Sequence, residues 1–251
     1  MILSASRRTD IPAYYSEWFI NRLQAGFVLT RNPMNHVQVS KIILDPEVID
    51  CIVFWTKDPL NMLDKLDVID RLGYKYYFQF TVTPYDKSVE KGLRNKEEII
   101  KTFCELSDRI GKDKVIWRYD PIILNDMFSL SYHKEQFTRL CSKLGRYTGQ
   151  CIISFVDIYS KLRTDILREI SMDEMIELGK MVSSIAKDFG ITVKACCEKE
   201  FLYEYGIKQA HCIDKELIEN ICGYSPDLKR DKNQRDSCGC YESIDIGAYN
   251  T

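Results

Sequence analysis

The sequence lacks both a long hydrophobic run and a strong net charge. No apolar stretch approaches the roughly 20 residues that span a bilayer, so we expect no membrane attachment. The 35 Lys and Arg residues nearly balance the 37 Asp and Glu residues, which leaves a net charge of −2. Such a chain has no global field to recruit nucleic acid or an anionic membrane. At the start of the chain the basic residues follow the short apolar stretch, the reverse of a secretory signal. We therefore expect a cytoplasmic protein.

A glycine-rich phosphate loop and paired CxxC knuckles are also missing. The first strand-like run, Ile2–Ala5, is followed by SRRTD, which argues against a doubly wound dinucleotide-binding sheet. Without an export signal, and with 251 residues to build a core, the ten cysteines are expected to be reduced thiols. Four of them lie in apolar periodic segments and are expected to be inert core residues: Cys51, Cys104, Cys141 and Cys151.

Strand-like and helical patterns alternate along the chain. The predicted strands are Ile2–Ala5, Phe27–Thr30, Cys51–Trp55, Tyr76–Val82, Val115–Trp117, Cys151–Phe155, Thr192–Ala195 and a shorter run at His211–Ile213. The predicted helices are Ala13–Gln24, Leu60–Leu72, Lys96–Ile110, His133–Leu144 and Met172–Phe189, and Val37–Leu44 reads as the second strand of a hairpin. This order predicts an α/β fold, a (β/α)8 TIM-barrel-like single domain over residues 1–222. Residues 223–251 are predicted to form an irregular, cysteine-containing extension packed on the barrel, and a doubly wound open sheet is the alternative.

Five of the apolar runs break into polar residues just ahead of a proline. These prolines are Pro12, Pro33, Pro59, Pro84 and Pro121. Proline ends a strand and suits the first turn of a helix, so each polar cluster falls at the carboxyl end of a strand. In parallel α/β proteins that edge carries the active site.

Cationic side chains are predicted at this edge. Arg7, Arg8 and Arg118 offer planar donors suited to phosphate or carboxylate, and Gln79 is expected to face inward beside them. Lys57 is a cation or, if desolvated, a nucleophile. The acid–base candidates are Asp10, Asp120 and Glu198, with Asp157 completing the ring of polar strand ends. The alternative for Asp10 is a structural one, an ion pair at the rim or a helix cap.

Four late cysteines form a candidate metal site: Cys197, Cys212, Cys238 and Cys240. Closure of a barrel would bring the ends of the last two strands together, and a tail folded over the mouth would add two more thiolates. Such a set suits zinc or an iron–sulfur cluster. The alternative is a group of reduced, partly buried thiols. The three histidines have no partners at ligand spacing and are not expected to be functional.

Long blocks of the sequence resemble a family of unknown function, DUF1848. They include SASRRTDIPAYYSEWFINRL, IDCIVFWTKDP, YYFQFTVTPY, VIWRYDPIILN and QRDSCGCYESIDIGAYNT, and the resemblance runs from Ile2 to Thr251. It implies a TIM-barrel-like protein. In that family the last block is followed by CxxxCxxC, which resembles the cluster motif of radical S-adenosylmethionine enzymes. The sequence ends at Thr251, so the resemblance does not extend to S-adenosylmethionine binding by these residues.

The sequence therefore favours an enzyme with a metal or iron–sulfur centre, acting on a small anionic substrate at the carboxyl mouth of a barrel. Two alternatives remain open at this level. One is a module that binds or modifies nucleic acid, which would require a continuous basic track and steeply salt-dependent binding. The other is a catalytically silent barrel that binds a partner.

Overall fold

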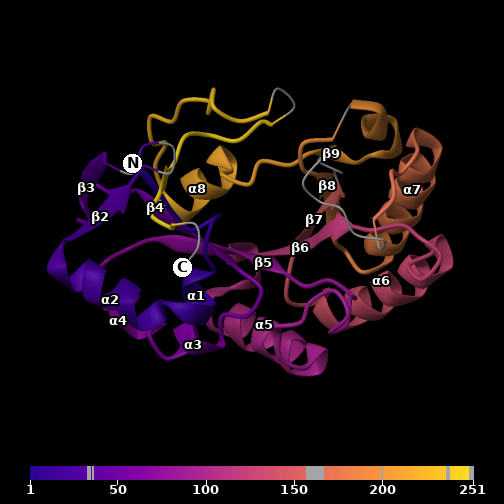
Figure 1. Ribbon diagram of the computed structural model, residues 1–251, viewed down its shortest axis with the longest axis horizontal. Coiled ribbons are helices and arrows are strands. Elements are labelled where there is room, and N and C mark those ends of the chain that lie inside the picture. The colour runs from indigo at the N-terminus through magenta and orange to yellow at the C-terminus, as the bar shows by residue number, and fades with distance from the viewer. Residues whose placement is uncertain (33–34, 36, 157–166, 199, 236–237, 249–251) are drawn as a thin grey trace. The chain divides into compact units, whose positions relative to one another are not determined.

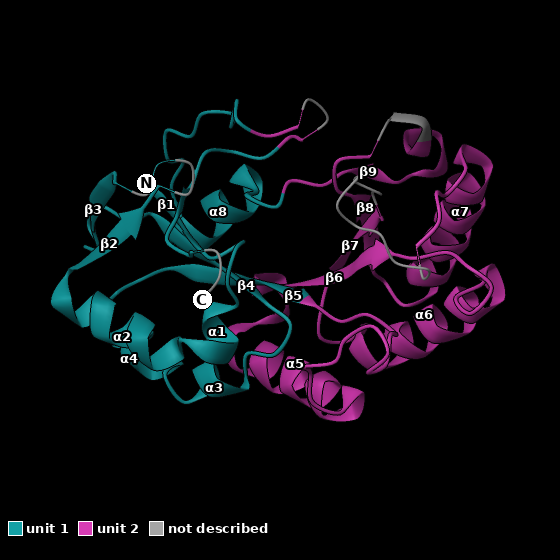
Figure 2. Ribbon diagram, in the orientation of Figure 1, with its two compact units in different colours: residues 1–80, 212–233, 240–251 teal, residues 81–211, 234–239 magenta. Residues whose placement is uncertain are grey.

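The chain folds into two compact units, coloured separately in Figure 2. The computed structural model describes residues 1–251 except 33–34, 36, 157–166, 199, 236–237 and 249–251. Unit 1 comprises residues 1–80, 212–233 and 240–251, and unit 2 comprises residues 81–211 and 234–239. The late segment that the sequence marks as an extension is thus divided between the two units.

Unit 1 is built on four parallel strands in the order β10-β1-β4-β5. These strands are β1 (Ile2–Ala5), β4 (Cys51–Thr56), β5 (Tyr76–Thr81) and β10 (Ile244–Asp245). The helices of the unit, labelled in Figure 1, are α1 (Ile11–Tyr14), α2 (Ser16–Ala25), α3 (Leu60–Leu63), α4 (Leu66–Arg71) and α8 (Lys215–Cys222). The short strand β10 comes from the late polar segment, which carries little strand signal, and it pairs with the buried edge of β1.

The core of unit 1 explains which way the β5 side chains point. The Phe54 ring on β4 stacks on Phe78 of β5 at 4.7 Å, and Phe19 of α2 meets Phe54 edge-on at 5.4 Å. Because strand side chains alternate between faces, Gln79 lies on the face opposite to Phe78. It is buried there, as the alternation in FQFTVT predicts.

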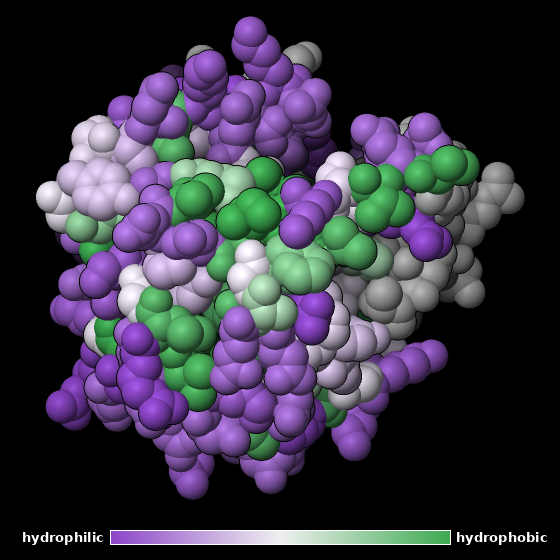
Figure 3. Space-filling view, turned by 90° about the vertical axis from the view of Figure 1, so that its left-hand side faces the viewer, coloured by the Kyte–Doolittle hydropathy of each residue, from purple (hydrophilic) through white to green (hydrophobic). Residues whose placement is uncertain are grey.

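The strand β2 (Phe27–Arg31) is not part of the parallel sheet. It pairs antiparallel with β3 (Val39–Ile43) as a separate hairpin. The hairpin itself was predicted, but the expectation that Pro33 marks the end of a buried parallel strand is wrong. Three apolar side chains of the hairpin, Leu29, Val39 and Ile43, are exposed. Figure 3, which faces this side of the molecule, shows apolar residues gathered on its surface.

Unit 2 also contains four parallel strands, in the order β6-β7-β8-β9. They are β6 (Val115–Ile122), β7 (Gln150–Phe155), β8 (Thr192–Ala195) and β9 (Lys208–Gln209). The helices are α5 (Lys96–Ile110), α6 (Leu130–Leu144) and α7 (Met172–Asp188), with 3₁₀ turns at Lys112–Lys114 and Glu200–Tyr205. In Figure 2 these three α-helices lie along the outer side of the unit 2 strands.

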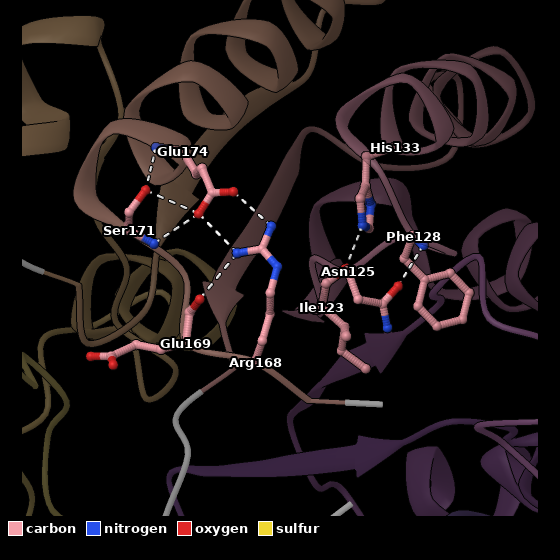
Figure 4. A network of polar contacts seen from close by, with 8 residues as sticks. All are labelled: Ile123, Asn125, Phe128, His133, Arg168, Glu169, Ser171 and Glu174. Atoms are coloured by element: carbon pink, nitrogen blue, oxygen red, sulfur yellow. Dashed lines mark hydrogen bonds and ion pairs between the residues drawn. The ribbon is translucent and has the colours of Figure 1, made fainter. Parts of the chain in front are cut away.

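The start of α7 is held by a capping box, for which Ser171 followed three residues later by Glu174 is the sequence signature. The Ser171 hydroxyl accepts from the Glu174 N–H, and the Glu174 carboxylate accepts from the Ser171 N–H. Arg168 donates to both oxygens of the same carboxylate. The Glu174 side chain therefore both completes the capping box and binds Arg168 of the preceding segment (Figure 4). Beside it in Figure 4, His133 of α6 contacts the backbone oxygen of Ile123 at 2.8 Å.

The fold class is therefore mixed α/β, with eight parallel strands among the residues that the structure describes, and closure into a (β/α)8 barrel stays a prediction. Seven of the predicted strands are present with bounds within a few residues, but the run at His211–Ile213 is wrong. The last short strand of unit 2 is β9, at Lys208–Gln209. Among the described residues no helix is long and apolar enough to cross a bilayer.

Candidate functional site

A cavity of about 360 Å³ opens at the carboxyl ends of β6, β7 and β8 in unit 2. Every residue that lines it belongs to that unit. The lining residues are Arg118, Asp120, Pro121, Ser154, Phe155, Val156, Cys196, Cys197, Glu198, Gln234 and Arg235. The cavity thus lies at the strand edge where the sequence predicts chemistry.

Alternation along β6 sends Arg118 and Asp120 to the same face. Trp117 and Tyr119 pack on the Phe137 ring of α6, with ring centroids 5.1 and 5.0 Å away. The residues between and after these aromatics therefore face the other side of the sheet. Arg118 is only 7% exposed. Its guanidinium donates from two nitrogens to the two carboxylate oxygens of Asp120, and this forked ion pair holds both groups in one orientation.

The strand register aligns one residue from each of β6, β7 and β8 in a layer at the base of the cavity. Arg118 of β6 lies beside Ile152 of β7, which in turn lies beside Lys194 of β8. Two residues further along β7 and β8, on the same face, Ser154 and Cys196 reach the lining. Ser154 was not among the predicted site residues, although its position one residue from a strand end is a signal that could have identified it.

The end of β8 brings two thiols and a carboxylate to the cavity. The sulfur atoms of Cys196 and Cys197 lie 3.9 Å apart. Cys197 has a left-handed backbone with φ of 58°, a conformation that non-glycine residues seldom adopt. The Glu198 carboxylate accepts from the backbone N–H of Phe155 at 2.9 Å, which ties the residue after β8 to the end of β7.

Part of the late polar segment completes the lining. Gln234 and Arg235 belong to unit 2 and are exposed beside the cavity. The segment is fixed at its far end, where a ring nitrogen of His211 contacts the Gly239 backbone oxygen at 2.7 Å. A Cβ added at Gly239 would overlap the His211 ring. Glycine is therefore required at this position.

The predicted acid–base residue Asp10 lies in unit 1, at the start of α1. Its carboxylate accepts from the Ala13 N–H at 3.0 Å and from the Lys57 N–H at 2.7 Å. Burial penalises the charged form and raises the pKa of Asp10 to about 6, although these backbone donors and the Thr56 side chain lower it. The residue caps a helix, as its structural alternative predicts, and its pKa also suits proton transfer near neutral pH.

The predicted cations of unit 1 surround the same strand ends. The Arg7 guanidinium is exposed and stacks over the Trp55 ring at 5.2 Å. The side chains of Arg8 and Lys57 are half-buried. The Asp245 carboxylate of β10 accepts from the Ser6 hydroxyl at 2.6 Å and from the Arg7 N–H at 3.0 Å.

Gln79 and two of the predicted metal ligands meet on the inner face of the unit 1 strands. The backbone oxygen of Cys212 accepts from the Gln79 amide at 3.0 Å and from the Tyr77 hydroxyl at 2.8 Å. The Cys212 N–H in turn donates to the sulfur of Cys240 at 3.1 Å. Both cysteines are buried, and their contact lies within unit 1.

The four predicted metal ligands are divided between the units. Cys212 and Cys240 lie in unit 1, and Cys197 and Cys238 lie in unit 2. A structural zinc site takes four ligands, and neither unit by itself supplies that number from this set. Within the described ranges no three His, Cys, Asp or Glu side chains gather in a group that could hold a metal. The four-cysteine centre stays a prediction.

Cys104, Cys141 and Cys151 have the raised pKa values expected of thiols that are partly or fully buried. Burial raises the pKa of Cys104 to about 11 and that of Cys141 to about 12, and it raises the pKa of Cys151 further. Such thiols are unreactive at neutral pH. His133 is fully buried, with its second ring nitrogen 2.7 Å from the Tyr119 hydroxyl. Asp157, His36 and Asp236 lie outside the described residues.

The structure thus brings together Arg118, Asp120, Glu198 and Cys197 of the predicted set, all in unit 2, around one cavity. Within unit 1 it groups Asp10 with Lys57, and Gln79 with Cys212 and Cys240. Cys196, Gln234 and Arg235 also line the cavity. In the sequence Gln234 and Arg235 belong to a mixed charge run that reads either as a phosphate-contacting loop or as a solvated face. All three gain their role from the strand register and from the return of the late segment.

Comparison with known proteins places the chain in a family but assigns no activity. A solved crystal structure of a "putative alpha-L-fucosidase" from Bacteroides thetaiotaomicron is 9% identical, with a TM-score of 0.33 over 89% of this chain and 84% of that one. That similarity carries no argument about function. No protein with a curated description matches the sequence. The profile of DUF1848, a domain of unknown function, matches residues 2–251, and the chain therefore belongs to the DUF1848 family.

Proposed function

We propose that this protein is an enzyme that binds a small phosphate- or carboxylate-bearing substrate in the unit 2 cavity. The observation that carries the proposal is the buried Arg118 at the carboxyl end of β6, lining a cavity of about 360 Å³. Small-molecule sites commonly span about 300–1,000 Å³, so a cavity of this size suits a metabolite better than a polymer. The near-zero net charge supports the same choice over nucleic acid.

The Arg118–Asp120 pair supports an anion site rather than a purely structural role. A buried guanidinium is costly unless it is paired, and Asp120 provides that partner while fixing the plane of the fork. Arg235, exposed at the same cavity, adds a second positive charge for an entering anion.

Glu198 is the proposed acid–base group of this site. The N–H of Phe155 holds one carboxylate oxygen at 2.9 Å, which orients the side chain on the rim that it shares with Cys197. General acid–base catalysis requires a carboxyl group held within reach of the bound substrate. The backbone of a neighbouring strand orients this carboxylate toward that requirement.

Anion-dependent thermal stability tests the proposal. Phosphate, pyrophosphate, citrate and chloride are titrated against the purified protein while its melting temperature is recorded. Losing one charge-assisted hydrogen bond costs about 1.5–3 kcal/mol, so Arg235→Gln and Arg118→Met should each weaken the binding of a stabilising anion by about 10- to 100-fold. Arg146→Gln, at an exposed arginine of unit 2 outside the cavity lining, is the matched control.

Two outcomes would overturn the anion site. One is that no multivalent anion raises the melting temperature beyond the effect of chloride at equal ionic strength. The other is that Arg235→Gln binds anions as tightly as Arg146→Gln does. Glu198→Gln separates the catalytic part, since it should retain anion binding and lose turnover of any substrate found.

A wider form of the proposal adds a metal or iron–sulfur centre and the candidate residues of unit 1. In that form zinc or an iron–sulfur cluster is the cofactor that the four cysteines predict, and Asp10, Lys57, Arg7, Arg8 and Gln79 are candidate residues of unit 1. Iron, sulfide and zinc analysis of protein purified without oxygen tests the metal. Unaltered metal content in Cys197→Ser and Cys240→Ser would contradict the assigned ligands.

A further inference from the structure

Cys196 and Cys197 place two sulfur atoms side by side at the end of β8. Consecutive residues of a strand normally point to opposite faces, which would separate their sulfurs. Cys196 still continues the strand, because its N–H donates to the Ile153 backbone oxygen at 2.8 Å. Cys197 then turns into the left-handed region, with φ of 58°. The sulfurs lie 3.9 Å apart as a result.

The left-handed backbone at Cys197 is a cost that glycine would avoid. It is the one non-glycine residue with positive φ in the part of the chain that the structure describes. The β-carbon disfavours this conformation, whereas glycine adopts it freely. Backbone of this kind is retained mainly where it serves a site. Because glycine would suit this backbone better, we attribute the presence of cysteine at position 197 to its thiol.

The distance between the sulfurs matches the geometry of two ligands to one atom. A tetrahedral centre with metal–sulfur bonds of about 2.3 Å sets its sulfurs about 3.8 Å apart. Both cysteines line the cavity of about 360 Å³, which leaves room for an atom with further ligands. We propose that Cys196 and Cys197 form a dithiol site that holds one thiophilic atom, a zinc-group ion or a trivalent arsenical, through both sulfurs.

The binding step involves no oxidant or reductant. With a divalent ion, each thiol loses a proton and each sulfur donates an electron pair, so that two protons are released for each ion bound. With an organic arsenoxide, two sulfur–arsenic bonds form, and the oxygen leaves with both thiol protons as water. The site does not depend on the proposed anion function, because it uses neither Arg118 nor Arg235.

Two probes distinguish the two kinds of ligand. Cadmium ion is titrated into the reduced protein while the thiolate-to-cadmium charge-transfer absorption in the ultraviolet is followed. EDTA should remove the ion and abolish this absorption. Phenylarsine oxide is followed by intact mass, and one adduct formed with loss of water is expected, reversible by a dithiol but not by EDTA. Both probes should bind with a stoichiometry of one per chain.

Variants locate the site and separate binding from folding. Cys196→Ser and Cys197→Ser should each weaken cadmium binding by at least about tenfold and prevent the bridged arsenical adduct. Cys197→Gly should do the same while melting at an equal or higher temperature, because glycine relieves the left-handed backbone. Cys104→Ser and Cys222→Ser are the controls, because neither cysteine lines the cavity.

The proposal is overturned if the bridged adduct survives in Cys197→Gly, or if Cys222→Ser abolishes it. It is also overturned if neither probe binds the reduced protein. Loss of the adduct in Cys197→Gly, together with unchanged anion-dependent melting, supports the dithiol site independently of the anion site.

Discussion

The pH dependence of stability should carry a signature of Asp10. Burial raises the pKa of its carboxyl group from 3.8 to about 6. The folded protein therefore binds a proton more tightly at this site than the unfolded chain does. By linkage, the contribution of Asp10 to stability is greatest at low pH and falls as the pH rises from about 4 to about 6.

The size of the effect follows from the two pKa values. One pKa unit corresponds to 1.36 kcal/mol, so the shift from 3.8 to about 6 amounts to about 3 kcal/mol in full. About 2 kcal/mol of this falls between about pH 4.5 and 7.5. Because the side chain is half-buried, solvent screening reduces that value to about 1–2 kcal/mol.

Asp10→Asn removes the titrating group while keeping an oxygen that can accept from Ala13 or Lys57. Urea unfolding of both proteins at several pH values gives the difference in unfolding free energy. The variant should gain about 1–2 kcal/mol relative to the wild type between about pH 4.5 and 7.5. Asp227→Asn, at an exposed aspartate of unit 1, is the control and should show no such change. A pH-independent difference for Asp10→Asn would refute the reasoning.

Three further results are expected. Gly247→Ala should lose about 1–3 kcal/mol of unfolding free energy, because an added Cβ would overlap the Ser6 side chain. Glu174→Gln should lose about 0.5–1 kcal/mol in urea unfolding. Arg168 and the Ser171 N–H lower the pKa of Glu174 to about 2, so this loss should be present above about pH 4.5 and disappear as the pH falls toward 2. Cys151 should resist iodoacetamide at pH 8 until urea unfolds the protein, as read by mass mapping, because burial raises the pKa of its thiol well above 9.0.

Matched variants keep these results specific. Gly149→Ala adds a Cβ whose nearest contact is 3.8 Å away and should change stability little, so an equal loss in both glycine variants would remove the steric explanation. Glu169→Gln alters an exposed neighbour of the capping box and should leave stability unchanged at both pH extremes. Labelling of Cys151 at the rate of Cys196 in the folded protein would contradict its burial.

Local signals in the sequence were sufficient where short-range physics decides the structure. Ser171 followed by Glu174 predicted the start of α7, because both bonds of the capping box form within one turn. Alternation in FQFTVT placed Gln79 opposite Phe78, since the period of two is a property of any strand. The same rule predicts that Arg118 and Asp120 share a face, once Trp117 is assigned to the helix side.

Signals failed where pairing between distant segments decides the structure. Phe27–Thr30 reads as another buried strand, yet β2 pairs antiparallel with β3 outside the parallel sheet. Nothing local predicts that choice, because the same apolar residues suit either pairing. The last strand of unit 2 was placed at His211–Ile213 for the same reason, while the short β9 owes its existence to pairing with β8.

The sequence by itself determined the α/β class, the alternation of elements and the presence of polar residues at strand ends, because these depend on spacing along the chain. Only the tertiary structure decided which of those residues share a cavity. Arg118, the adjacent residues Cys197 and Glu198, and Arg235 come from three separate parts of the sequence and meet through strand register and the return of the late segment. Tertiary structure also brought the Cys196 and Cys197 sulfurs together, because a single left-handed residue reverses the alternation that the sequence would predict.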